Sequence, residues 1–408
     1  MRIGYLHLSP HQDHESGVTR FGRYLADALS CSSQAEVEQA MVMLDPVHPF
    51  DPSLNAALDR LRHCDILHLQ YSKYIGLRGW QKLKLLRQIR QKFSGKLCVT
   101  LHDVYLDLYP KHGALADWKY HHHRLRDQSG RRSQALWDTA AYVWQHHLAD
   151  KSIMHWLLQQ ADLPLVCHQA EAKRLQHFTG GDRLQIIPHF VEERSAVLSL
   201  TAAKRAVGLA PDRPILTLQG FIYRGKGHQL LLDALKQLPE AVQVVFAGGM
   251  APNQEAYECE LKAHIQALGL SDRVQITGYL SEEDLERYLA ASDLAICPFK
   301  VLSASGSIAT WISIGRPILA YDLPQVRELN QLVPGSIQTF KQYDAEALAA
   351  AIQAGLQPAV MAEAIQRIRE LRIRLSPEAI AAAHLECYLR LLQPSIRAAK
   401  AQRETVEV

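Results

Sequence analysis

The sequence has almost no net charge and no long apolar run. Its 45 Lys and Arg residues nearly balance 42 Asp and Glu residues, which leaves a formal net charge of +3 over 408 residues. This value argues against the strongly basic surface with which nucleic-acid-binding domains attract phosphate, so we expect no nucleic-acid partner. No apolar run approaches the ~18 residues of a membrane-spanning helix. The sequence therefore argues against a nucleic-acid-binding protein and against a membrane-spanning one.

Closely spaced cysteines are also absent. The seven cysteines are scattered along the chain and none forms a C-x-x-C pair. The N-terminal apolar stretch turns polar at Ser9, too early for the apolar core of a signal peptide. We therefore expect a reduced, cytoplasmic protein.

The composition is that of a globular protein with more than one domain. Hydrophobic residues make up 48% of the chain and charged residues 21%, which are ordinary globular values. A chain of 408 residues is too long for one ordinary core, and two domains of roughly 200 residues fit this length.

The first half alternates short apolar strands with helical segments. This alternation predicts an α/β domain at 1–191 with a parallel sheet covered on both faces. Between 111 and 160 aromatic and basic residues follow helical periodicity, which indicates a helical insertion. The expected strands are Ile3–Leu8, Gln39–Leu44, Ile66–Gln70, Leu97–Leu101, Leu163–Cys167 and Leu184–Ile187. The expected helices include Val18–Leu29, Gly76–Phe93 and Glu171–Phe178.

The second half repeats this architecture without repeating the sequence. We expect a hinge at 192–209, a second α/β domain at 210–375, and a terminal segment at 376–408 that contains the helix Pro377–Leu392. The expected strands are Ile215–Leu218, Val242–Ala247, Val274–Thr277, Leu294–Cys297, Pro317–Ala320 and Ile337–Thr339. The expected helices are Gln229–Leu238, Glu255–Leu268, Glu282–Ala291 and Ser307–Ile314.

Two loops of this second domain have the composition of phosphate-binding loops. Each follows an apolar strand and is rich in glycine or hydroxyl residues, at Gly220–Gly227 and at Ser303–Thr310. Backbone N–H groups at a helix N-terminus bind anions without a charged side chain. The pair of loops predicts a site for a nucleotide diphosphate.

The motifs of the second domain resemble those of the GT-B glycosyltransferases, most closely family 4, which retains the anomeric configuration and uses sugar nucleotides. Order and spacing match over roughly 215–330, through Leu218–Gly220 with Lys226-Gly227, Phe246–Gly249, Val274–Tyr279, Ala291–Leu294 and Gly315–Ala320. The first domain matches more weakly, at Gly17, at His102-Asp103 and at Ile187–Val191. The resemblance implies two Rossmann-like domains facing across a cleft, with the last helix crossing back to the first domain.

The resemblance assigns roles on the donor side. Lys226 would reach the donor diphosphate beside Gly220 and offset the negative charge of the leaving nucleotide. The family usually has an arginine directly after the first glycine, where this chain has Phe221, and Arg224 could take its place. A solvated Lys-Arg turn remains the alternative.

The chain departs from the family at the second loop. Two glutamates commonly stand eight residues apart there, at the places held here by Leu302 and Thr310. The first is associated with the transferred sugar and the second with the ribose. Thr310 could make part of the ribose contact, and Glu328 could supply a replacement carboxylate.

Other donor contacts follow from the same resemblance. Backbone N–H groups of Ser305, Gly306, Ser307 and Ile308 could still bind phosphate, although a Ser/Gly-rich turn without a ligand is the alternative. The base would lie at Tyr279 and Leu280, where a half-buried aromatic at a strand end is equally compatible with the pattern.

His102 is the main candidate on the acceptor side. It ends a strand, where parallel-sheet enzymes bind ligands, and the family places a histidine near the reacting carbon. It would orient a sugar hydroxyl rather than act as a base. His68 and Gln70 could line the same cleft, and Gly17 would let the backbone approach phosphate.

Histidine runs and a basic helix suggest further partners. His121–His123 and His146-His147 lack a carboxylate or cysteine at ligand spacing, so we expect solvated helix faces and no metal site. The basic helix 78–92 could contact anionic phospholipid at the inner face of the membrane, or be solvated.

These inferences predict a metal-independent hexosyl transferase without a cofactor. It would move a sugar from a nucleotide diphosphate-sugar to a glycan or lipid-linked acceptor in polysaccharide or glycoconjugate biosynthesis. A catalytically silent GT-B scaffold and a non-hydrolysing epimerase of sugar nucleotides remain alternatives. A P-loop triphosphatase is disfavoured because Gly227 stands where Ser or Thr should bind Mg²⁺. A dinucleotide oxidoreductase is disfavoured because Ser9–Gly17 lacks G-x-G-x-x-G.

Overall fold

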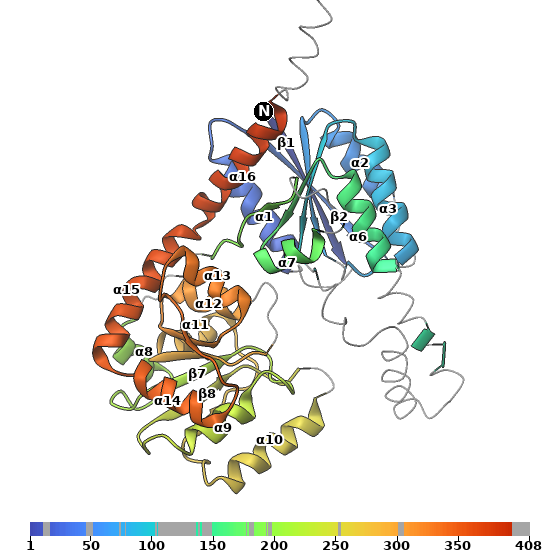
Figure 1. Ribbon diagram of the computed structural model, residues 1–408. Coiled ribbons are helices and arrows are strands. Elements are labelled where there is room, and N and C mark those ends of the chain that lie inside the picture. The colour runs from blue at the N-terminus through green and yellow to red at the C-terminus, as the bar shows by residue number, and fades with distance from the viewer. Residues whose placement is uncertain are drawn as a thin grey trace, which may run out of the picture. The chain divides into compact units, whose positions relative to one another are not determined.

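The chain divides into two compact units (Figure 1). The first contains Met1–Pro188 together with Ile380–Val408, and the second contains His189–Ala379. The computed structural model describes residues 1–10, 17–45, 52–72, 75–77, 79–102, 104, 136–137, 139–140, 149–176, 178, 183–192, 194, 198–251, 254–300 and 306–393. Most of the predicted insertion at 111–160, with both histidine runs, lies outside these residues.

The first unit is built on a six-stranded sheet whose described strand pairs are all parallel, in the order β2-β1-β3-β4-β5-β6. The predicted α/β fold with parallel sheets is confirmed. The strands are β1 (Arg2–Pro10), β2 (Glu36–Leu44), β3 (Ile66–Tyr71), β4 (Lys96–Leu101), β5 (Leu163–Val166) and β6 (Gln185–Ile186).

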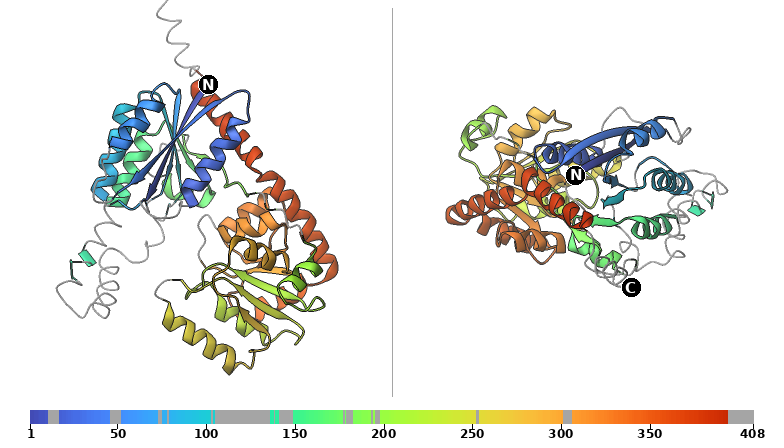
Figure 2. Two further views of the ribbon diagram at one scale, coloured as in Figure 1. Left: turned by 180° about the vertical axis from the view of Figure 1, so that it is seen from behind. Right: turned by 90° about the horizontal axis from the view of Figure 1, so that it is seen from above.

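Helices cover both faces of this sheet (Figure 1). On one face lie α2 (Pro52–Leu61), α3 (Gly79–Lys92) and α6 (Asp150–Gln160). The other face is covered by α1 (Gly17–Ser30) and α16 (Pro377–Leu392), which lie on the same side of the sheet in the view from behind (Figure 2). A short helix, α7 (Gln169–Leu175), follows β5.

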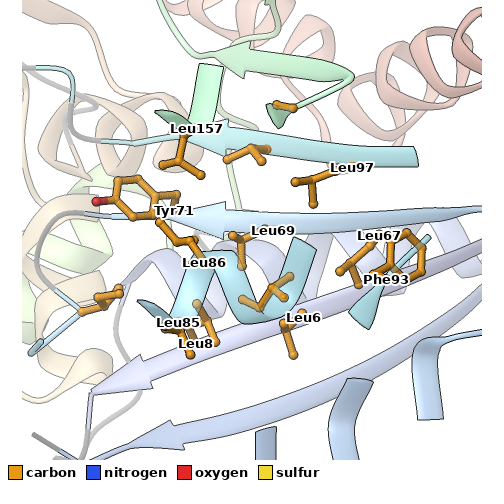
Figure 3. Close-up of a cluster of buried hydrophobic side chains, with 14 of the residues drawn as sticks. Leu6, Leu8, Leu67, Leu69, Tyr71, Leu85, Leu86, Phe93, Leu97 and Leu157 are labelled. Atoms are coloured by element: carbon orange, nitrogen blue, oxygen red, sulfur yellow. The ribbon is translucent and has the colours of Figure 1, made fainter. Parts of the chain in front are cut away.

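The main core of the first unit lies between the sheet and the α2–α3–α6 layer (Figure 3). Leu67 and Leu69 of β3 point into it, together with Leu85 and Leu86 of α3 and Leu157 of α6. Each fully buried side chain of this size contributes about 1.5–3 kcal/mol. Because side chains alternate along a strand, the intervening residues of β3 and β4 face α1 and α16 instead.

The final helix α16 belongs to the first unit from Ile380 onward. The hydroxyl groups of Tyr388 and Tyr5 are 2.8 Å apart, and both side chains are completely buried. A C-terminal helix that returns to the first sheet was the prediction from family resemblance.

The second unit contains a parallel sheet in the order β12-β11-β10-β7-β8-β9. The strands are β7 (Ile215–Gln219), β8 (Gln243–Ala247), β9 (Val274–Ile276), β10 (Leu294–Cys297), β11 (Ile318–Tyr321) and β12 (Gln338–Phe340). The helices are α8 (Leu200–Ala206), α9 (His228–Leu235), α10 (Glu255–Ala267), α11 (Glu282–Ala290), α12 (Gly306–Ile314), α13 (Pro324–Leu332), α14 (Ala345–Gly355) and α15 (Pro358–Arg374).

The segment 192–209, expected to be a hinge, lies within the second unit and contains α8. Lys204 of α8 is buried, and its Nζ lies 2.7 Å from Oδ2 of Asp293. The same carboxylate oxygen accepts a hydrogen bond of 2.7 Å from the backbone N–H of Ile215. This buried ion pair joins α8 to the sheet, which a polar composition alone does not reveal.

Among the described helices, no single one is long and apolar enough to cross a membrane. A bent pair, Ala345–Gly355 with Pro358–Leu392, meets the length and composition requirement only when the two are taken together.

Candidate functional site

The loops after β7, β8, β9 and β10 carry the site in the second unit, because these four strands are neighbours and run in the same direction. Gly220 follows β7 with a φ of 102°. A Cβ atom on Gly248, which follows β8, would collide with the carbonyl oxygen of Gly220. The two glycines thus allow two strand ends to approach each other more closely than side chains would permit.

Lys226 points back over Gly220. A Cβ atom on Gly220 would lie 2.5 Å from Nζ of Lys226, so only glycine leaves room for the ammonium group. Lys226 is only 6% exposed. Its ammonium lies over the rings of Tyr223 and Phe299, 5.9 Å and 5.7 Å from their centroids.

The charge of Lys226 has no acidic partner among the described residues. Within the described part of the chain, its ammonium group forms neither an ion pair nor a hydrogen bond. Burial lowers the pKa of Lys226 to about 8. A buried ammonium without an acidic partner is costly, and an anionic ligand would remove that cost.

Gly227 fixes the start of α9. It has a φ of 96°, and a Cβ atom there would lie 2.6 Å from Cγ of Pro298, at the end of β10. The hydroxyl of Tyr343 donates a hydrogen bond of 2.9 Å to the carbonyl oxygen of Pro298. The loop from Gly220 to Gly227 is therefore held at both ends by glycines in close contact with neighbouring strand ends.

The second predicted loop is described from Gly306, where α12 begins. The hydroxyl of Ser307 donates a hydrogen bond of 3.1 Å to the carbonyl oxygen of Gln219, which brings the start of α12 beside Gly220. Thr310 donates its hydroxyl to the carbonyl oxygen of Gly306, 2.7 Å away. Ile308 is buried. Ser305 and Leu302 lie outside the described residues.

The residues expected at the base and ribose have different environments. Tyr279 is 84% exposed, and a Cβ atom on Gly249 would lie 3.1 Å from its backbone nitrogen. Leu280 packs against a small cluster that includes Ile215. Glu328 is half-buried in α13. Of these three residues, Tyr279 has the side chain most open to a ligand.

Arg224 is not directed at Lys226. Its guanidinium forms an ion pair with Glu260 and lies over the ring of Tyr257, 5.1 Å from the centroid. The predicted contact of Arg224 with a diphosphate would require this exposed pair to open.

His228 was not among the predicted site residues. It is completely buried at the start of α9, and among the described residues neither ring nitrogen has a hydrogen-bond partner. Burial, and then the charge of Lys226, lower its pKa to about 3. The only sequence feature that could have indicated His228 as a site residue is its position directly after Lys226-Gly227.

The first unit presents His102 at the carboxyl end of β4. The side chain is only 4% exposed, and its Nε2 lies 2.6 Å from Oε1 of Gln70. The ring of Phe21 meets it edge-on, with 5.3 Å between centroids. Burial, followed by the effect of His384, lowers the pKa of His102 to about 3. His102 is therefore neutral at physiological pH and a weak base.

The environments of the other predicted residues in the first unit differ from expectation. His68 and Gln70 could have lined the same cleft as His102, but their side chains are 0% and 2% exposed: Tyr388 of α16 contacts His68, and Gly22 of α1 lies against Gln70. They bond to buried partners instead. Gly17 is the first residue of α1, and no described atom would lie within 4 Å of a Cβ there.

The basic helix α3 is less exposed than expected. Lys82 is buried, and its ammonium lies 3.6 Å from the carboxylate of Asp150. Arg90 donates hydrogen bonds of 3.1 Å to the carbonyl oxygens of Phe93 and Gly95. The exposed charges of the helix are Lys84, Arg87 and Lys92, while Arg78 lies outside the described residues.

Comparison with known proteins shows what the second unit resembles. Residues 201–369 match the model of the family "Glycosyl transferases group 1". A D-inositol 3-phosphate glycosyltransferase of Xylanimonas cellulosilytica is 24% identical over 259 residues, which are 57% of this chain and 61% of that protein. The enzyme of the same name from Mycobacterium sp. (strain KMS) is 31% identical over 145 residues, 35% of this chain and 33% of that protein. The chain thus spans less than two thirds of either relative.

Solved structures share the whole fold. Sucrose-phosphate synthase from Thermosynechococcus elongatus has a TM-score of 0.65 at 21% identity, covering 96% of this chain and 98% of its own. Anabaena HepE in complex with UDP and glucose has a TM-score of 0.66 at 15% identity, covering 96% of this chain and 100% of its own. The chain therefore has the GT-B fold, and its segment 201–369 is similar to the group 1 glycosyl transferases.

Proposed function

We propose that the protein is a retaining glycosyltransferase that moves a hexosyl group from a nucleotide diphosphate-sugar to a glycan or lipid-linked acceptor. The observation that supports this most is the buried ammonium of Lys226 beside Gly220, which has no partner among the described residues of the unit that matches the family model. An ammonium in this state needs an anion, and the diphosphate of the donor has the required charge.

The proposed reaction needs a positive charge at the leaving group. The bond between the sugar C1 and the β-phosphate oxygen breaks, and its electron pair stays on the phosphate. The acceptor oxygen bonds to C1 on the same face, and its proton passes to the departing phosphate oxygen. Lys226 offsets the charge that develops on that phosphate, so the proposal requires no metal ion.

A neutral His102 supports an orienting role. With a pKa of about 3 it cannot hold a transferred proton at neutral pH, but a neutral imidazole can still hydrogen-bond a hydroxyl. In the proposed reaction His102 orients a sugar hydroxyl at the reacting carbon. This matches a retaining transfer that uses no separate base.

The location is part of the same proposal. All seven cysteines are free thiols, which supports the cytoplasm. The exposed Lys84, Arg87 and Lys92 of α3 support a peripheral contact with an anionic membrane, where a lipid-linked acceptor would be found.

A binding screen followed by a transfer assay tests this function. The full chain would be heated with UDP, GDP, ADP and their glucose conjugates, with EDTA present throughout. We expect one nucleotide to raise the melting temperature, and its sugar conjugate to release the nucleoside diphosphate slowly in water. Stabilisation by none of the nucleotides would contradict a nucleotide-sugar donor.

A catalytically silent scaffold is the second candidate, favoured by the absence of carboxylates at Leu302 and Thr310. It predicts that the nucleotide binds but that no sugar is transferred or hydrolysed. A non-hydrolysing epimerase predicts instead that the sugar nucleotide is isomerised without release of the nucleoside diphosphate. The products of the same incubation therefore distinguish all three.

A further inference from the structure

Two aromatic side chains of the loop that carries Lys226 are exposed. Phe221 is 54% exposed and Tyr223 is 43% exposed, although both stand within five positions of a buried ammonium group. Phe221 also stands where the family usually has an arginine. Single apolar residues on a protein surface are ordinary, but two neighbouring rings beside a candidate binding site indicate a ligand surface.

A tight turn brings Tyr223 beside Lys226. The backbone N–H of Lys226 donates a hydrogen bond of 3.2 Å to the carbonyl oxygen of Tyr223, which closes a four-residue turn. Gly225, the third residue of this turn, has a φ of 99°, as a type II turn requires. In this arrangement the ammonium lies 5.9 Å from the centroid of the Tyr223 ring.

Phe221 and Tyr223 lie on the same side of an extended segment. The N–H of Ile222 donates to the carbonyl oxygen of Gly249 from 2.8 Å, and the N–H of Ala251 donates to the carbonyl oxygen of Ile222 from 2.9 Å. Ile222 is completely buried in the core of the second unit. Because successive side chains of an extended segment point in opposite directions, the two rings point away from this core.

The exposed Tyr279 lies one strand further from the ammonium. It follows β9, and a Cβ atom on Gly249, which follows β8, would lie 3.1 Å from its backbone nitrogen. In a nucleotide sugar the sugar is bonded to the β-phosphate through one oxygen, whereas the ribose and the α-phosphate separate the base from it. With the β-phosphate on Lys226, the ring beside the ammonium is therefore nearer the sugar, and Tyr279 nearer the base.

The chemistry of the two rings fits a neutral sugar. A hexose has hydroxyl groups around its rim and C–H bonds on its faces, and these slightly positive hydrogens are attracted to the negative face of an aromatic ring. The loop Gly220–Gly227 contains two cations. In the proposed function Lys226 binds the diphosphate, and Arg224 already forms an ion pair with Glu260, so neither is left for an acidic sugar.

We propose that Phe221 and Tyr223 bind the donor sugar, a neutral hexosyl group that stacks on the two rings through a C–H face while Lys226 holds the β-phosphate. This inference rests on the proposed function and extends it to recognition of the sugar. A sugar held by its face needs no carboxylate of the kind that the family has where this chain has Leu302.

Paired affinities for a nucleoside diphosphate and for its glucose conjugate isolate the sugar contact. The nucleotide selected by the thermal screen would be titrated in both forms into the native full chain, Phe221→Leu, Tyr223→Leu and the double variant. Leucine keeps an apolar side chain but has no flat face. We expect each single variant to bind the glucose conjugate ~3- to 10-fold more weakly, and the nucleoside diphosphate with nearly native affinity.

Control variants separate the ring from other effects. Tyr223→Phe keeps the ring and should keep both native affinities. Tyr24→Leu removes an exposed aromatic ring of the first unit and should change neither affinity. Equal weakening of both ligands in the double variant would overturn the proposal, because the rings would then serve the nucleotide or the loop. Native affinity of the double variant for the glucose conjugate would overturn it as well.

Failure of the proposed function gives a different result. If neither form of any nucleotide binds the native protein, the donor is not a nucleotide sugar, and methyl α-D-glucopyranoside alone then tests the two rings by saturation-transfer NMR. Saturation of the aromatic protons should reach the C–H protons of the sugar in the native protein but not in the double variant. Equal transfer in the two proteins, or none in either, would overturn the inference.

Discussion

The ammonium nitrogen of Lys226 lies 2.5 Å from the point that a Cβ atom on Gly220 would occupy. The glycine and the lysine therefore act together, because no larger residue at 220 leaves the ammonium where it is. Six positions separate them in the sequence, and the loop between them folds back so that the charge lies over the start of the loop.

We expect Gly220→Ala to weaken nucleotide-sugar binding nearly as much as loss of the lysine. The new methyl group would displace the Lys226 ammonium and occupy a backbone with a φ of 102°. Gly225→Ala is the matched control, because Gly225 has a φ of 99° but no described atom within 4 Å of its Cβ position. Calorimetric affinities that fall equally in the two variants would assign the effect to backbone strain alone.

Lys226→Met should stabilise the ligand-free protein. A lysine whose pKa is about 8 instead of 10.5 destabilises the fold by about 3 kcal/mol at neutral pH. Because the folded-state pKa is lowered, this destabilisation is complete below pH 8 and disappears as the pH rises toward 10.5. We therefore expect a higher melting temperature for the variant at pH 7 and equal values near pH 10.5. A lower melting temperature at pH 7 would show that the ammonium is already compensated.

His102→Ala should reduce turnover by at least ~10²-fold and leave donor affinity within a few-fold, since we propose that His102 acts at the reacting centre and not in the donor loops. With a pKa of about 3, His102 should also give no inflection in kcat between pH 5 and 8. His264→Ala, in the second unit, is the control. Native turnover in His102→Ala would leave this residue a structural role only.

The sequence predicted the strands more reliably than the environments of their side chains. The strands expected at Ile66–Gln70 and Leu97–Leu101 lie within one residue of β3 and β4, because short apolar runs between helices are a strong signal. The same residues gave the wrong expectation for His68 and Gln70. A strand position specifies which face a residue occupies, but not that α16, more than 300 positions later, covers it.

In the second unit, too, the sequence predicted the position of an element better than the contacts of its side chains. The motif Gly220–Lys226 predicted a loop at a strand end, and the structure contains that loop. The pairing of Arg224 with Glu260 depends on where α10 lies relative to the loop, which no local pattern contains. The helices α13, α14 and α15 were also missed, although the sequence carries start signals for them: Pro324 and Pro358 begin α13 and α15, and Asp344 caps α14.

We predict little discrimination between ribose and 2′-deoxyribose. The hydroxyl of Thr310 is bonded within its own helix, and a carboxylate contact worth about 1.5–3 kcal/mol is missing at this position. Competition between a nucleoside diphosphate and its 2′-deoxy form should give affinities within ~30-fold. A larger preference for ribose would show that another carboxylate binds the ribose hydroxyls. Glu328→Gln would be the first variant to test for that carboxylate.

The central claim is that the ammonium of Lys226 binds the donor diphosphate, and calorimetry at two pH values tests it most directly. The nucleotide sugar selected by the thermal screen would be titrated into the native protein, Lys226→Met and the exposed control Lys236→Met, at pH 7 and pH 9.5. At pH 7 we expect Lys226→Met to bind ~30- to 150-fold more weakly, which corresponds to about 2–3 kcal/mol for a charge-assisted contact. Because the free lysine has a pKa of about 8, the native protein should lose at least ~10-fold in affinity by pH 9.5, and Lys226→Met should lose none. Equal affinity of Lys226→Met and the native protein at pH 7 would contradict the account.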